Sequence, residues 1–154
     1  MRDRARPRII AHRGASAAAP ESTRAAIREA VRAGADMVEL DVQMTRDGRL
    51  VIFHDERLER TTNGHGVLRR ARFADVARLD AGGWFQPRFS GERVLLVSQA
   101  LRLIPPRIGV NLELKRTRTP RPTRSSTCTA PASTVSSASC ASAASSTSPA
   151  TRCR

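Results

Sequence analysis

The stretch MVELDVQMTRDGRLVIFHD, residues 37–55, decides the fold that we predict for this chain. In its first half, strand alternation sends the aliphatic side chains to one side, so that Glu39 and Asp41 share the other. Like charges this close raise each other's pKa unless a cation neutralises them, and a divalent ion does so most simply. A solvated strand of an antiparallel sheet is the alternative interpretation of such a pair. After a turn at 47–48, a second apolar run ends in His54, at the carboxyl end of a strand.

The same arrangement recurs twice elsewhere in the chain. Residues 8–11 form an apolar run that ends in His12 and Arg13. In residues 110–115, alternation puts two leucines on one side and three polar residues on the other. The recurrence favours a functional site, because four short strands then deliver polar groups near their carboxyl ends. These groups are His12, Arg13, Glu39, Asp41, His54, Glu113 and Lys115.

Residues 20–34 predict a helix between the first two strands. The helix is expected to start around Pro20-Glu21-Ser22, with Ser22 as the N-cap, and to end at Gly34 after apolar residues at helical spacing. The order strand, helix, strand indicates a βαβ unit with parallel strands and a right-handed crossover. A second helix is expected over Ser98–Ile104, before two prolines.

Residues 56–97 break this alternation and are too long for a simple connection, so we interpret them as an insertion beside the site. Residues 61–66 have turn chemistry, and the apolar spacing over 73–79 suggests a short helix. We interpret His65, among glycines, as a solvated loop residue rather than a ligand. Trp84-Phe85 is interpreted as a local packing anchor rather than a substrate platform.

The chain has 154 residues, enough for one domain with a modest core, and a net charge of +13. Lys115 is the only lysine, so arginine supplies nearly all of the excess. Such an excess is compatible with a nucleic-acid or acidic-membrane partner. The arginines are scattered, without a basic helix or interleaved aromatic residues, which favours an arginine-biased coding composition instead. We therefore expect no nucleic-acid partner.

The N-terminus is charged and no apolar segment follows it, which argues against a secretory signal. No run reaches the roughly 18 apolar residues of a spanning helix. We therefore expect a cytoplasmic protein without an integral membrane segment, and the sequence leaves the oligomeric state open.

Residues 118–154 form a tail of Arg, Thr, Pro, Ser, Ala and Cys, with one Val and no acidic residue. Such a segment buries too little apolar surface to offset its ordering entropy, so we expect it to be disordered and place a boundary after domain 1–117. The loose spacing of Cys128, Cys140 and Cys153 favours incidental thiols over a disulfide framework or a zinc site. We interpret the tail as an out-of-frame translation of a longer gene, with a modified Ser/Thr/Pro-rich tail as the alternative.

Six short motifs together resemble the glycerophosphodiester phosphodiesterase family in order and spacing, over residues 8 to about 116. They are His12-Arg13-Gly14, Pro20-Glu21-Ser22-Thr23, Val38-Glu39-Leu40-Asp41-Val42, Phe53-His54-Asp55, Thr61-Thr62-Asn63-Gly64 and Asn111-Leu112-Glu113-Leu114-Lys115. The resemblance implies an α/β fold, the (β/α)₈ barrel, with the site at the carboxyl ends of the strands, and it identifies 56–97 as a family-type insertion. Eight strands close such a barrel in about 250 residues, so we expect only its first half here, about four βα units.

The resemblance also implies the roles of the polar residues. It assigns metal-binding carboxylates to Glu39, Asp41 and Glu113, acid–base histidines to His12 and His54, and phosphate-holding cations to Arg13 and Lys115. An all-oxygen ligand set suits Ca²⁺ or Mg²⁺ as the cofactor. The implied reaction is hydrolysis of a small-molecule glycerophosphodiester to glycerol 3-phosphate and an alcohol. Which histidine is the acid, and whether water or the substrate's own hydroxyl attacks, stays open.

Two departures from the family pattern lie inside the matched region. Ser22 stands where the family usually has Asn, so the helix should still start there while neighbouring contacts weaken. Residues 96–99 replace a Pro-Thr-Leu-Glu-like helix start, where Ser98 can still act as the cap.

Half a barrel leaves open strand edges and an uncovered apolar face, so we expect a weakly stable chain with little or no activity. The alternatives are a related barrel phosphodiesterase acting on lysophospholipids and a non-functional fragment.

Overall fold

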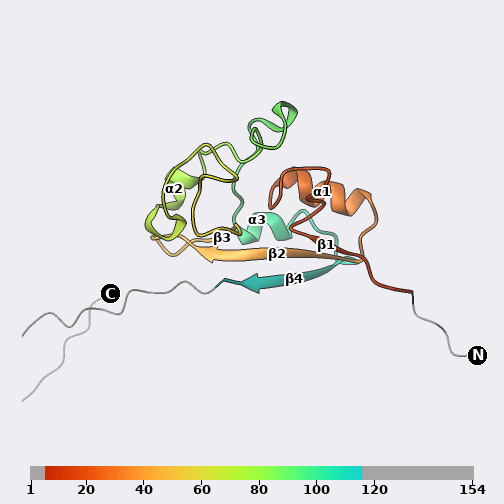
Figure 1. The fold of residues 1–154 in the computed structure, drawn as a ribbon. Coiled ribbons are helices and arrows are strands. Elements are labelled where there is room, and N and C mark those ends of the chain that lie inside the picture. The colour runs from red at the N-terminus through yellow and green to blue at the C-terminus, as the bar shows by residue number, and fades with distance from the viewer. Residues whose placement is uncertain (1–5, 116–154) are drawn as a thin grey trace, which may run out of the picture. The chain divides into compact units, whose positions relative to one another are not determined.

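The computed structural model describes residues 6–115 (Figure 1). In chain order the elements are β1 (Ile10–His12), α1 (Arg24–Arg32), β2 (Met37–Met44), β3 (Leu50–Ile52), η1 (Leu68–Arg70), α2 (Phe73–Val76), η2 (Pro87–Phe89), α3 (Val97–Leu101) and β4 (Gly109–Leu114). The predicted tail with its three cysteines lies outside the described residues.

β2 is the central strand of a four-stranded sheet. β4 runs parallel to it along one edge, pairing residues 109–114 with 37–42. β1 runs parallel along the other edge beside residues 37–39, and β3 lies antiparallel beside residues 42–44 of that same edge. The parallel β1–β2 pair with α1 between the two strands confirms the predicted strand-helix-strand unit.

β3 is antiparallel to β2, which differs from the parallel strands of the four βα units that the resemblance implies. Only residues 45–49 connect β2 to β3, too few for the crossover that a parallel partner requires. Thr45 N donates to Arg49 O at 3.0 Å, and Gly48 takes the left-handed φ of 76° that glycine adopts without strain. His54 therefore follows a hairpin and not a parallel strand of the barrel type.

α1 begins one residue later than a Ser22 cap would give. Thr23 is the N-cap, and its hydroxyl accepts a hydrogen bond from Ala26 N at 3.4 Å. Ser22 instead has a left-handed φ of 60°, a conformation that Asn and Gly adopt more easily than Ser. Gly34 follows the helix with φ 75°, as predicted for its C-terminal end.

Two apolar clusters hold the described part of the chain together. In the first, the side of β2 that carries Val38, Leu40 and Val42 packs against α1 and α3, which lie over the same face of the sheet (Figure 1). The second joins β3 to the insertion around buried Leu68 and Val76. Because the core fills one face of β2, the alternate residues of this strand line the opposite face.

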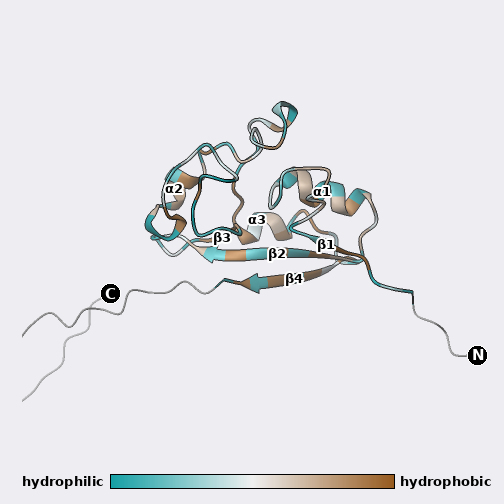
Figure 2. Ribbon diagram, viewed as in Figure 1, coloured by the Kyte–Doolittle hydropathy of each residue, from teal (hydrophilic) through white to brown (hydrophobic). Residues whose placement is uncertain are grey.

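β4 is much more exposed than β2. Its apolar residues Val110, Leu112 and Leu114 are 36%, 38% and 75% exposed, and Figure 2 shows apolar colour along this border strand. The register places them on the same side as the buried residues of β2. No helix among residues 6–115 covers them, so the expected open edge and uncovered apolar face are present here.

Residues 56–97 contain α2 at the predicted position. Trp84 donates from Nε1 to Ala81 O at 2.9 Å, and its ring centroid lies 5.6 Å from that of Phe85. These contacts are local, but Trp84 is 41% exposed, so it packs only in part. His65 is exposed in its loop, as expected.

α3 begins at Val97, so Ser98 lies inside the helix and is not its cap. Leu96 is the N-cap, and the side chain of Gln99 accepts a hydrogen bond from Leu96 N at 3.0 Å. The helix also ends earlier than predicted, at Leu101. None of the helices between residues 6 and 115 combines the length and apolarity needed to cross a membrane.

Candidate active site

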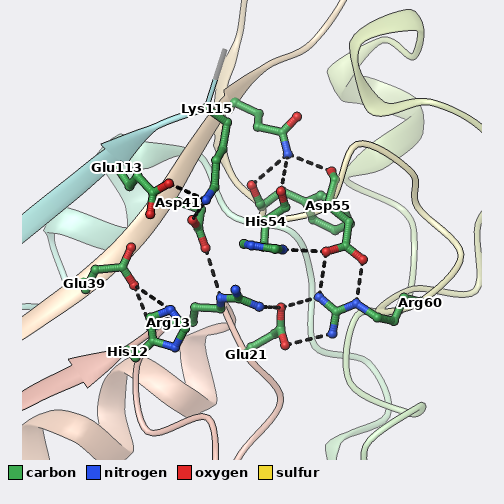
Figure 3. Close-up of polar contacts among 12 residues, drawn as sticks. His12, Arg13, Glu21, Glu39, Asp41, His54, Asp55, Arg60, Glu113 and Lys115 are labelled. Carbon is green, nitrogen blue, oxygen red and sulfur yellow. Dashed lines mark hydrogen bonds and ion pairs between the residues drawn. The ribbon is translucent and has the colours of Figure 1, made fainter. Parts of the chain in front are cut away.

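The carboxylate groups of Glu39, Asp41 and Glu113 meet at one point of the sheet (Figure 3). The register of the parallel strands brings them together, because it pairs Asp41 with Glu113 while Glu39 lies on the same face of β2. One oxygen atom from each group lies within 4.8 Å of the others. This spacing allows the three groups to ligate a single ion.

The donor atoms fit a hard divalent cation. Glu39 Oε1 and both oxygens of Asp41 are buried and accept no hydrogen bond from the described residues. A buried carboxylate oxygen without a partner is costly, whereas a bound cation would satisfy it. Carboxylate oxygens are the ligands that Ca²⁺ and Mg²⁺ prefer.

Two cationic side chains lie against Asp41. Lys115 Nζ is 2.9 Å from Asp41 Oδ1 and 2.5 Å from Glu113 Oε1, and Arg13 Nε is 3.2 Å from Asp41 Oδ2. Each oxygen of Asp41 therefore faces one cationic side chain. Glu113 and then Asp41 raise the pKa of Lys115, while the hydrogen bond from Lys115 lowers the pKa of Glu113. Positive charge thus adjoins the carboxylates.

A tight turn after β1 directs Arg13 into this site. Arg13 has a left-handed φ of 57°, and its backbone N–H donates to Glu39 Oε2 at 3.1 Å. A Cβ at Gly14 would lie 2.7 Å from the backbone carbon of Ala26, so only glycine allows the turn to approach α1 this closely. In the sequence His12-Arg13-Gly14, the glycine is therefore explained by the shape of the turn, and the arginine by its charge beside the carboxylates.

The two predicted histidines lie near the carboxylates but come from different elements. His12 ends β1 in register with Glu39, with Nε2 3.8 Å from Glu39 Oε2 and a side chain 63% exposed. His54 follows β3, and its Nδ1 lies 2.6 Å from Asp55 Oδ1. Figure 3 shows the second ring nitrogen of His54 on the side where Asp41 lies. All seven predicted site residues are thus brought into one region.

Sequence reasoning missed Gln43, which supports the segment carrying His54. Gln43 continues the polar face of β2, so the alternation that revealed Glu39 and Asp41 could have found it. Its Nε2 donates to three successive backbone carbonyls, those of residues 53, 54 and 55, at 3.0, 2.9 and 2.7 Å. Gln43 therefore fixes the backbone from which the imidazole of His54 projects.

Sequence reasoning also missed Glu21, Asp55 and Arg60, which form an ionic network beside the site (Figure 3). Hydrogen bonds from Arg60 lower the pKa of Asp55 to about 2. Burial of the carboxylate raises this pKa, and the hydrogen bond from His54 lowers it further. Burial raises the pKa of Glu21, but Arg60 and Arg13 together lower it below its ordinary value. Local sequence gives no signal for this network, because Glu21 and Arg60 are 39 positions apart.

Ser22 lies beside the network with its hydroxyl buried and without a hydrogen-bond partner in the described residues. A cavity of about 10 Å³ adjoins Glu21, Ser22 and His54, which is room for one water molecule. The helix starts despite the serine, as expected, because Thr23 supplies the cap.

Known proteins share this sequence and architecture. Residues 12–134 match the Glycerophosphoryl diester phosphodiesterase family. The glycerophosphodiester phosphodiesterase of Caldanaerobacter subterraneus subsp. tengcongensis is 45% identical over 108 residues, which cover 70% of this chain and 44% of that protein. The Bacillus subtilis protein YhdW is 49% identical over 107 residues, again covering 70% of this chain and 44% of the relative.

Solved structures agree with these sequence matches. A glycerophosphodiester phosphodiesterase from Agrobacterium tumefaciens has a TM-score of 0.70 and 45% identity, covering 72% of this chain and 48% of that one. An Oleispira antarctica phosphodiesterase, solved with the product sn-glycerol-3-phosphate, has a TM-score of 0.69 and 42% identity, covering 71% and 44%.

The chain spans less than half the length of each of these four relatives. The likeness confirms the predicted fold class, an α/β fold of the (β/α)₈ barrel type of which the described residues form a part. The family match covers most of the sequence. The chain therefore belongs to the glycerophosphoryl diester phosphodiesterase family.

Proposed function

We propose that this chain carries the catalytic end of a metal-dependent phosphoric diester hydrolase that cleaves glycerophosphodiesters to glycerol 3-phosphate and an alcohol. The observation that carries the proposal is the convergence of three carboxylates, Glu39, Asp41 and Glu113, within 4.8 Å beside two cations. The Oleispira antarctica relative, solved with sn-glycerol-3-phosphate, supports a phosphate ester as the ligand.

In this proposal the three carboxylates hold a divalent cation, Ca²⁺ or Mg²⁺. The cation would polarise the phosphoryl group and lower the pKa of an oxygen nucleophile. Arg13 and Lys115 hold the phosphate, because their positive charges oppose the negative charge that builds on the non-bridging oxygens. Both side chains already lie beside Asp41 and so need no long movement to reach a bound phosphate.

His12 and His54 form the acid–base pair of the proposal. An imidazole with a pKa near 6.5 can take a proton from the attacking oxygen or give one to the departing alkoxide at neutral pH. His12 is mostly exposed and adjoins Glu39, whereas His54 is held by Asp55 and the backbone contacts of Gln43. The nucleophile is water or a hydroxyl of the substrate itself.

We infer that residues 1–117 are the amino-terminal half of a barrel domain, with 56–97 as an insertion and 118–154 as a separate tail. Among residues 6–115, β4 pairs only with β2, and this supports the division, because the next strand of a closed barrel would pair with the other edge of β4. The remaining strands would complete the pocket wall around the substrate alcohol. We therefore expect weak stability and little or no hydrolysis by this chain alone.

Metal binding tests the site directly. Calorimetric titration of the full chain with Ca²⁺ and with Mg²⁺ should give a saturable signal that Asp41→Asn weakens by at least about tenfold. Glu56→Gln is the matched control, because Glu56 is exposed and contacts only Arg69 outside the site. The absence of saturable binding of either ion by the folded chain would contradict the proposal.

A substrate panel tests the reaction itself. Glycerol 3-phosphate release from glycerophosphocholine and glycerophosphoethanolamine would be measured with and without EDTA, and lysophosphatidylcholine would be included in the same panel. Metal-dependent release from the first two supports the proposed activity and shows that the half barrel is less impaired than we expect. Cleavage confined to the lysophospholipid would replace the proposed substrate class.

A further inference from the structure

Arg60 joins the two segments of the site that carry the histidines. Its guanidinium contacts both oxygens of Asp55, through Nε at 2.5 Å and Nη2 at 2.9 Å. The same group contacts both oxygens of Glu21, at 3.0 and 2.7 Å. Glu21 in turn accepts a hydrogen bond from Arg13 Nη1 at 3.0 Å. The planar guanidinium group of Arg60 therefore links the loop after β1 to the loop after β3.

The contact of Asp55 with His54 fixes one form of the imidazole. Asp55 is ionised and can only accept, so His54 Nδ1 donates the hydrogen bond that spans 2.6 Å. The proton then resides on Nδ1, and Nε2 keeps its lone pair on the side of the carboxylates (Figure 3). Asp55 can hold this form only while its own carboxylate is held in place.

The backbone of this segment does not depend on Arg60. The buried side chain of Gln43 binds the carbonyl groups of His54 and Asp55 from the strand side, through part-buried hydrogen bonds. Removal of the Arg60 side chain should therefore leave the course of the chain unchanged and release only the Asp55 carboxylate. Arg60 itself is 45% exposed, so its ion pairs contribute little to global stability.

We propose that Arg60 is a positioning residue for His54: by clamping Asp55 and Glu21 together, it keeps the proton of the neutral imidazole on Nδ1 and directs Nε2 to the bound phosphate. This inference rests on the proposed function of the site, in which Nε2 exchanges a proton with the substrate. It assigns a role to a residue of the insertion, outside the seven predicted site residues.

The tautomer of His54 provides a readout that an ordinary surface ion pair would not change. The chain has only three histidines, so ¹⁵N-histidine labelling of the full chain gives three imidazole signals, which His54→Gln assigns. Recorded well above the ordinary pKa of an imidazole, the ¹⁵N shifts report which ring nitrogen carries the proton. Arg57→Gln is the matched control, because Arg57 lies in the same segment and pairs only with Glu59 at 2.6 Å.

We expect the Nδ1–H form to predominate in the wild-type chain and in Arg57→Gln, and to become the minor form in Arg60→Gln. Arg60→Lys should fall between them, because an ammonium group cannot contact two carboxylates in the bidentate manner of a guanidinium. An unchanged His54 tautomer in Arg60→Gln, or an equal change in Arg57→Gln, would overturn the proposal. Loss of folded structure in both Arg60 variants would also overturn it, since Arg60 would then be a stability residue.

Wherever hydrolysis is measurable, Arg60→Gln should lower kcat by about tenfold or more with little change in KM, as for residues that orient a functional group without touching the substrate. The tautomer measurement needs no turnover. A changed tautomer in a folded chain that binds neither Ca²⁺ nor Mg²⁺ would therefore reject the proposed function and keep the positioning role. Saturable metal binding with an unchanged tautomer would do the reverse.

Discussion

β2 and β4 are parallel neighbours that donate carboxylates to the same cluster, yet they lie in opposite environments. β2 is paired on both edges, and its Asp41 side chain is 1% exposed. β4 pairs only with β2 among the described residues, and its Glu113 side chain is 54% exposed. The apolar side chains of β2 are buried under two helices, whereas those of β4 meet solvent.

The difference shows that a site can be assembled by strand register before it is enclosed. Register alone sets Glu113 beside Asp41, because paired residues of neighbouring strands share a face. Enclosure depends on what covers the second strand. We therefore expect the geometry of the cluster to depend on β2, and we expect changes on β4 to alter ligand binding more than folding.

The largest expected effect is on the core side of β2. Leu40→Ala should lower the free energy of unfolding by about 2–5 kcal/mol, because Leu40 is fully buried and its truncation leaves a cavity. Leu112→Ala, at the paired position on β4, should cost well under half as much. Urea denaturation followed by circular dichroism measures both. Equal losses of unfolding free energy in the two variants would show that β4 is as well packed as β2, contrary to the difference described above.

The second prediction concerns the ion. Asp41→Asn should weaken the binding of Ca²⁺ or Mg²⁺ by at least about tenfold, or 1.4 kcal/mol, because it removes a buried charged ligand. Glu113→Gln should weaken binding less, since water can replace an exposed ligand atom. Calorimetric titration gives both affinities. A larger loss for Glu113→Gln would place the ion closer to β4 than we propose.

The third prediction concerns the stability of the folded chain at low pH. The pKa of Asp55 is lowered to about 2 in the folded chain, chiefly by Arg60, so its stabilising contribution is complete above about pH 4. That contribution is lost as the pH falls from about 4 to about 2, and it amounts to about 1 kcal/mol after allowance for solvent screening.

Urea midpoints at the two ends of this pH range should therefore differ less in Asp55→Asn than in the wild-type chain. Glu56→Gln should leave the difference nearly unchanged, because the exposed Glu56 side chain lies 3.4 Å from Arg69 and outside the Asp55 network. A flat wild-type profile over this range would contradict the strength of the Asp55–Arg60 pair.

The smallest expected effect on stability is at the end of β4. Leu114→Thr should change the free energy of unfolding by no more than about 0.5 kcal/mol, because the side chain is exposed on a free edge. The same substitution should reduce self-association, since an open apolar strand edge promotes pairing between chains. Sedimentation velocity at increasing concentration measures this reduction. Unchanged self-association would show that another surface of the chain is responsible for it.

Much of the fold and site could be predicted because it depends on local patterns. Alternation alone identified the shared face of Glu39 and Asp41, and it would also have identified Gln43. The same rule applied to β4 placed Glu113 and Lys115 on one side. Parallel pairing then brought these faces together without any further information.

Other features could not be predicted because they depend on backbone shape or on distant segments. Ser22 has a capping side chain, but its left-handed backbone removes it from the capping position and leaves that role to Thr23. The reversal of β3, by contrast, could have been predicted, because the Asp47-Gly48 turn and the short connection are visible in the sequence. The contacts of Arg60 with Glu21 exist only once both loops have folded.

The hairpin places His54 after β3, whereas the three carboxylates lie on β2 and β4. Residues 45–49 set how far β3 extends along β2, and a one-residue change there would invert every side chain of β3. The carboxylates belong to other strands and would stay where they are. A change in the length of this connection could therefore move His54, the proton-transferring group of our proposal, while the carboxylates that we propose as ligands of the ion remain in place.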